Sequence, residues 1–218
     1  MKMRASILIL FFMSLEVQGV CLPESPLMNK KMSMNNNAAL VKMEESVYRF
    51  QEIIGPILPN DHDLIVKLET LNPRVNALIN KLETNLVIEV YGGVLSHPDI
   101  NESTLMLLLC HEIGHYLGGA PFQSRGGWSS TEGQADYYSS SDCAHFMGLN
   151  ESSFLDAALR LTKIYAEVTR EAAPVLDSCD ERVSNRTNFG YPPIQCRLDT
   201  LIAGWRGQSR PKCWFKEI

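Results

Sequence analysis

The sequence lacks an excess of positive charge. Lys and Arg together number 20 against 25 Asp and Glu, which gives a formal net charge of −5. Nucleic-acid-binding domains usually present a basic surface, so we expect no nucleic-acid partner. Internal repeats and low-complexity tracts are also missing, which argues against a solenoid or a fibrous protein. With 218 residues, 45% of them hydrophobic, the chain can bury the core of an ordinary domain.

Long hydrophobic runs are scarce as well. The run from Ala5 to Leu15 is uncharged, but it is shorter than the roughly 20 residues that cross a bilayer as a helix. Lys2 and Arg4 precede it, and the short segment 17–19 follows it, which is the arrangement of a secretory signal peptide. We therefore predict a signal peptide over residues 1–19, cleaved after Gly19. A retained membrane anchor is the alternative.

Cleavage would leave a secreted or periplasmic protein without a stable membrane span. In such an oxidising compartment the cysteines can form disulfides, and six cysteines allow fifteen pairings that the sequence does not distinguish. Four of them lie after residue 140, so the C-terminal part is expected to be the more crosslinked. The six are Cys21, Cys110, Cys143, Cys179, Cys196 and Cys213.

The rest of the chain is predicted to form a flexible leader over residues 20–37 and a single domain over 38–218. The fold class expected is α+β, mostly helical, with a small sheet or hairpin before the main motif. We expect strand 85–91 with a partner over 75–79, and Asp99 and Glu102 as a capping box for the next helix. Helices are predicted over residues 38–54, 61–70, 101–117, 131–147, 151–173 and 194–204.

The sequence His111-Glu112-Ile113-Gly114-His115 lies within the predicted helix 101–117. Residues four apart in a helix project from one face, so the two imidazoles can bind one zinc ion. Glu112 is placed beside them, where its carboxylate can act on a water molecule. Chance occurrence on a solvated face is the alternative, but the apolar run 105–110 predicts a buried helix.

A zinc site needs a third protein ligand, and Glu132 is the best candidate. A further histidine six residues after His115 is not available, because Pro121 occupies that position. Glu132 begins the next predicted helix, and Asp136 lies one turn later, where it can accept a hydrogen bond from a zinc-bound histidine. The alternatives are a helix-capping role for Glu132 and ligation by His145.

The motif HEIGH followed by Glu132-x-x-Ala135-Asp136 resembles the gluzincin metallopeptidases, specifically the family of HtpX and the CAAX prenyl proteases. In that family Gly-Gly ends the strand before the motif helix, as Gly92-Gly93 does here, and a later His-Pro-Pro-x-x-x-Arg segment occurs. This chain has Tyr191 in place of that histidine and keeps both prolines and Arg197. The resemblance covers about residues 75–205.

The resemblance implies a zincin-like, zinc-dependent endopeptidase with one Zn²⁺ held by His111, His115 and Glu132. It gives Glu112 the role of general base and places Tyr191 near a peptide substrate. Tyr191 and Arg197 have structural alternatives, as a packing tyrosine and an ion-pair partner. A catalytically inactive zinc-binding or chaperone-like module is the alternative function.

The peptide substrate also needs a docking strand. An extended peptide can add to the edge of a sheet, and we expect strand 85–91 to supply that edge. The residues of this expected substrate strand are Val87, Glu89 and Tyr91.

Overall fold

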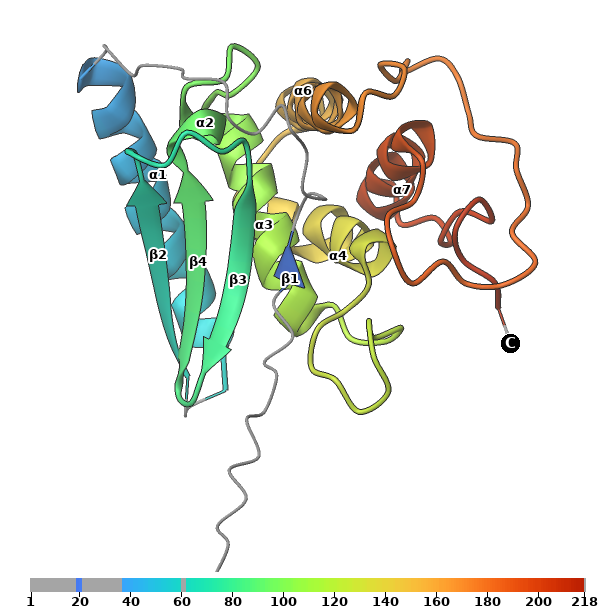
Figure 1. Ribbon diagram of the computed structural model, residues 1–218, viewed down its shortest axis with the longest axis horizontal. Coiled ribbons are helices and arrows are strands. Elements are labelled where there is room, and N and C mark those ends of the chain that lie inside the picture. The colour runs from blue at the N-terminus through green and yellow to red at the C-terminus, as the bar shows by residue number, and fades with distance from the viewer. Residues whose placement is uncertain (1–18, 21–36, 60–61, 218) are drawn as a thin grey trace, which may run out of the picture.

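A computed structural model describes residues 19–20, 37–59 and 62–217. Residues 1–18 of the predicted signal peptide and residues 21–36 of the predicted leader therefore lie outside the described residues. The sheet lies at one side of the view with the helix of residues 37–54 beside it, and most of the later helices lie toward the other side (Figure 1). This arrangement confirms the α+β class.

The sheet has four strands in the order β1-β3-β4-β2. Strands β3 and β4 form an antiparallel hairpin, whereas β2 runs parallel to β4. Strand β1 is a two-residue segment that pairs with β3 through Gly19↔Ile79 and Val20↔Leu78. The strands are β1 (Gly19–Val20), β2 (Asp63–Glu69), β3 (Ala77–Leu82) and β4 (Asn85–Tyr91).

The predicted strand 85–91 forms with the expected bounds, but it is not an edge. Each residue of β4 is paired with β2, and most are also paired with β3. Its backbone groups are therefore engaged on both sides, and it cannot accept a peptide as an added strand. The assignment of Val87, Glu89 and Tyr91 as the substrate strand was wrong.

Residues 61–70 were expected to form a helix, and this too was wrong, because residues 63–69 form β2. The segment alternates in burial: Leu64 is buried, Val66 and Leu68 pack against the core, and Ile65 is exposed. That two-residue period is typical of a half-buried strand. The backbone of this segment is paired with the neighbouring strand β4, and that pairing cannot be recognised from residues 61–70 alone.

The remaining helices match the predicted segments within a few residues. The expected helix 131–147 is divided by a π-helical stretch, η3, of the kind that often occurs near functional sites. The helices are α1 (Asn37–Ile54), η2 (Gly55–Ile57), α2 (Gly92–Leu95), α3 (Glu102–Leu117), α4 (Glu132–Tyr138), η3 (Ser139–Cys143), α5 (Ala144–Phe146), α6 (Glu151–Thr169) and α7 (Ile194–Trp205).

Helix α3 is capped differently from the expectation. The N-cap is Asn101, whose side chain accepts a hydrogen bond from the backbone N–H of Thr104 at 2.8 Å. The predicted box of Asp99 and Glu102 does not form this cap. Asparagine is among the best N-cap residues because its oxygen satisfies an N–H that lacks a partner within the helix.

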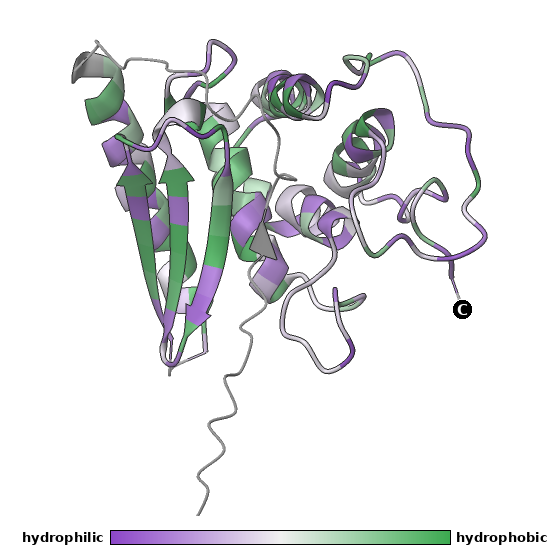
Figure 2. Cartoon of the chain, viewed as in Figure 1, coloured by the Kyte–Doolittle hydropathy of each residue, from purple (hydrophilic) through white to green (hydrophobic). Residues whose placement is uncertain are grey.

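The core surrounds α3, which packs against α1, β3, α4 and α6. Every residue from Thr104 to His115 is buried. Figure 2 shows that the hydrophobic first half of α3 gives way to more hydrophilic residues toward its C-terminal end. These hydrophilic residues are the HEIGH motif, so polar groups here lie inside the protein and require partners.

Two disulfides crosslink the described chain. Cys110–Cys143 joins α3 to η3, and Cys196–Cys213 joins α7 to the C-terminal segment. Cys179 is exposed and in no disulfide, and Cys21 lies outside the described residues. The expected crosslinking of the C-terminal part is thus found, together with a bridge between helices. Across the described residues, no helix has the length and hydrophobicity needed to cross a membrane.

Candidate metal centre

The two motif histidines and Glu132 lie together in the interior. The closest ring nitrogens and carboxylate oxygens of His111, His115 and Glu132 all fall within 4.8 Å of one another. Both histidines are fully buried and Glu132 is 2% exposed. The three residues come from neighbouring helices, α3 and α4, as the sequence predicts.

The distances within this group suit a shared cation better than direct hydrogen bonds. Nε2 of His111 lies 3.4 Å from Glu132 Oε2, and Nε2 of His115 lies 3.6 Å from Glu132 Oε1. Direct N–H···O hydrogen bonds cluster at about 2.9 Å. Ligands about 2.1 Å from a tetrahedral zinc ion stand roughly 3.4 Å apart, which agrees with both distances.

The outer nitrogen of each histidine is held by a separate acceptor. Nδ1 of His111 lies 2.8 Å from Asp136 Oδ1, and Nδ1 of His115 donates to the backbone carbonyl oxygen of Ser130 at 2.8 Å. A proton on Nδ1 leaves the lone pair on Nε2, so both rings present a metal-binding nitrogen toward Glu132. The expected role of Asp136 beside a ligating histidine is therefore supported by its contact.

The loop between α3 and α4 reaches His115 through backbone bonds. The N–H of Ser130 donates to the carbonyl of His115 at 2.7 Å, in addition to the bond from the His115 ring. Gln134 of α4 donates to the carbonyl of Gly118 at 2.7 Å, which ties the start of the loop to the second helix. Sequence reasoning missed Ser130, because a backbone acceptor leaves no signature in residue type.

Arg197 completes the buried cluster from α7. Its guanidinium forms a two-pronged ion pair with Asp136, at 2.7 and 2.9 Å, and lies 3.5 Å from Glu132 Oε2. It also lies 4.0 Å above the ring of Tyr165. Arg197 is 1% exposed, and its two contacts with Asp136 agree with the ion-pair alternative. Tyr165 was not identified from the sequence, where it reads as an ordinary core residue.

These contacts set the protonation of the cluster. Burial raises the pKa of Asp136, but Arg197 and His111 outweigh this effect and lower it to about 2. Burial is also the largest influence on His115 and lowers its pKa to about 4, although Glu132 acts in the opposite direction. His115 is therefore neutral at neutral pH, as a metal ligand must be.

The cluster is rich in negative charge for a buried site. Carboxyl groups of Glu112, Glu132 and Asp136 share the interior with the single guanidinium of Arg197, and Glu112 is fully buried. Within the described residues, Glu132 Oε2 and His115 Nε2 have no hydrogen-bond partner. A divalent cation would satisfy both atoms and balance the excess charge, so the residues fit a metal ion.

Two glycines bring the helices close enough to form the site. A Cβ atom on Gly114 would lie 2.8 Å from the carbonyl oxygen of Ala135, so α3 and α4 touch through their backbones. A Cβ atom on Gly133 would lie 2.5 Å from the ring of Trp214. The expectation that Gly114 accommodates a close neighbour agrees with this packing, whereas the contact of Gly133 with Trp214 was not foreseen.

The other candidates lie elsewhere. His145 is exposed, and its ring stacks on Trp205 with centroids 4.0 Å apart, so it is not the third ligand. Glu132 does not cap its helix, because Thr131 is the N-cap and makes no side-chain cap bond. Tyr191 is 39% exposed and precedes α7, so the structure does not bury it with the cluster.

The comparisons with known proteins identify no relative. No known family model, no curated protein and no solved structure matches this chain.

Proposed function

We propose that this protein is a zinc-dependent endopeptidase. The observation that carries the proposal is the set of Nε2–carboxylate distances of 3.4 and 3.6 Å between the two motif histidines and Glu132. Purely structural ion pairs would be expected to close to hydrogen-bonding distance. The residue types, two imidazoles and one carboxylate, are those of catalytic zinc sites that keep a fourth position for water.

The chain's own residues supply the remaining chemistry. A bound zinc ion would act as a Lewis acid that brings the pKa of a water molecule toward neutrality. Glu112 would accept a proton from that water and deliver it to the leaving amine of the peptide. His111 and His115 would stay fixed in orientation through Asp136 and the Ser130 carbonyl. Zinc binding alone does not require Glu112, which favours catalysis over an inactive zinc-binding module.

The place of the substrate differs from the original expectation. Strand β3 is the strand of the sheet beside the motif helix: Nζ of Lys81 lies 5.3 Å from the ring centroid of Tyr116, the residue after His115. An extended peptide would have to add to β3, where the two-residue β1 pairs.

The test is zinc content and casein cleavage, measured side by side for the wild type and for Glu112→Gln. We expect about one zinc per chain in both proteins and a loss of cleavage of about 10²–10⁴-fold in the variant. Wild-type protein that contains zinc but does not cleave casein or a mixed peptide library would favour the inactive module. Protein that takes up no zinc would refute both readings.

A further inference from the structure

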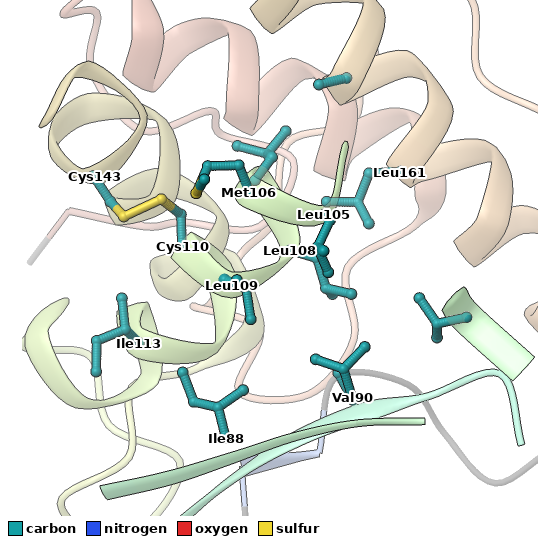
Figure 3. Close-up of a cluster of buried hydrophobic side chains, with 14 of the residues drawn as sticks. Ile88, Val90, Leu105, Met106, Leu108, Leu109, Cys110, Ile113, Cys143 and Leu161 are labelled. Atoms are coloured by element: carbon teal, nitrogen blue, oxygen red, sulfur yellow. A yellow bond between two sulfur atoms is a disulfide. The ribbon is translucent and has the colours of Figure 1, made fainter. Parts of the chain in front are cut away.

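The disulfide Cys110–Cys143 adjoins the metal centre. Cys110 directly precedes His111 on α3, and Cys143 ends η3, which continues the helix carrying Glu132. Both cysteines are fully buried, and their Cα atoms lie 5.5 Å apart. Figure 3 shows the bridge among hydrophobic residues of α3, including Leu109 and Ile113.

This disulfide also encloses the site along the chain. Its two cysteines are 33 residues apart, and every proposed ligand and the general base lie between them. Asp136 lies there too, so the loop contains the whole cluster except Arg197. Closing such a loop removes conformations in which the two ligand-bearing helices are separated, before any metal binds.

The other contacts that join α3 to α4 at the site are non-covalent. They include the 2.8 Å contact of His111 with Asp136 and the backbone contact of Gly114 with Ala135. Glu132 and Asp136, both on α4, also lie within ion-pair distance of Arg197 from α7, which does not connect them to α3. Among these contacts, the disulfide beside His111 is the covalent one, and it does not depend on bound metal.

We propose that Cys110–Cys143 is a positioning crosslink that preorganises the metal centre, so that its loss weakens metal binding beyond its effect on stability. This inference rests on the proposed function only in so far as the site binds zinc. It implies that full metal affinity requires the oxidised protein, as formed in an oxidising compartment.

The second disulfide offers a matched control. Cys196–Cys213 closes a shorter loop, with a sequence separation of 17, between α7 and the C-terminal segment. Neither of these segments supplies a proposed ligand, although α7 carries Arg197, which pairs with Asp136. A second control, Leu161→Ala, removes a side chain that is 1% exposed in the same core and leaves both crosslinks intact.

The experiment measures the zinc dissociation constant by competition with a chromophoric chelator, together with thermal unfolding of the metal-free proteins. We expect C110A/C143A to weaken zinc binding at least tenfold. We expect C196A/C213A and Leu161→Ala to lower the melting temperature while binding zinc within about threefold of the wild type. A folded C110A/C143A that binds zinc as tightly as the wild type would overturn the inference, as would an equal loss of affinity in the controls.

If C110A/C143A does not fold without metal, C110V/C143A is measured in its place, because valine fills part of the volume that the removed sulfur atoms leave. If neither variant folds alone, zinc is titrated while the circular dichroism is followed. Folding at one equivalent of zinc would overturn the inference, and a requirement for a large excess would support it. Wild-type protein that binds no zinc would instead refute the proposed function, so the two failures are distinguishable.

Discussion

Asp136 holds His111 through one carboxylate oxygen and Arg197 through both. Its Oδ1 lies 2.8 Å from His111 Nδ1 and 2.9 Å from Arg197 Nη2, and its Oδ2 lies 2.7 Å from Arg197 Nε. One carboxylate thus orients a proposed ligand and anchors α7 to the site. All three residues are buried, so none of these bonds can be replaced by bulk water.

The variant Asp136→Asn is expected to weaken zinc binding by about 10–100-fold. The amide oxygen of asparagine can accept a hydrogen bond from His111 or from Arg197. The amide N–H groups then point toward the N–H groups of the other residue, and two donors cannot bond to each other. The zinc dissociation constant reports the effect. Asp142→Asn is the control, because Asp142 lies in η3 and is exposed. An unchanged affinity in Asp136→Asn would show that Asp136 does not orient the ligand.

Arg197 is predicted to contribute most to the stability of the protein when metal is absent. Replacing it by methionine leaves Asp136 and Glu132 in the interior without a cation, which should lower the free energy of unfolding by about 3–5 kcal/mol. Zinc should recover part of that loss, because it supplies positive charge to the same carboxylates. Urea unfolding with zinc and with a chelator measures both effects.

Arg197→Lys is the companion variant. Lysine keeps the charge but cannot form the two-pronged pair with Asp136, so an intermediate stability is expected. If metal-free Arg197→Met were as stable as the wild type, the carboxylates would not depend on this guanidinium.

Gly133 is predicted not to tolerate a side chain. The Cβ atom of alanine would lie 2.5 Å from the Trp214 ring, which is fully buried. Overpacking of this kind lowers the free energy of unfolding by about 1–3 kcal/mol. Because residue 133 directly follows Glu132, a shift of its backbone should also lower the zinc affinity. Gly55→Ala is the control, because a Cβ atom there meets nothing within 4 Å. Chemical denaturation compares the two, and equal stability would contradict the predicted clash.

Helices and strands were predicted well where the residues of a single segment are enough to indicate its secondary structure. The bounds of β4 and α3 follow from the β-rich segment 85–91 and from the apolar run before the motif. The pairing partners of a strand depend on distant segments. The alternation in 63–69 was therefore overlooked, and the central position of β4, which β2 and β3 determine together, could not be read locally.

The candidate site follows the same rule. His111, His115 and Glu132 could be grouped from the sequence as candidate ligands because metal sites use characteristic residue types at characteristic spacings. Asp136 followed from its position one turn after Glu132, and Arg197 from the resemblance; α4 and α7 bring them together here. The Ser130 carbonyl, the Tyr165 ring and the pairing of Cys110 with Cys143 depend on the tertiary arrangement of helices, which no local pattern specifies.

The role of Tyr191 is the last prediction. In the proposed peptidase, Tyr191 stands where the resembled metallopeptidases have a substrate-side histidine, and it is 39% exposed. We expect Tyr191→Phe to lower kcat by about 10²–10³-fold, the typical effect of removing one hydrogen-bond donor to a developing oxyanion. KM, zinc content and melting temperature should stay close to wild-type values. A change in melting temperature without a change in kcat would instead assign Tyr191 to packing at the turn before α7.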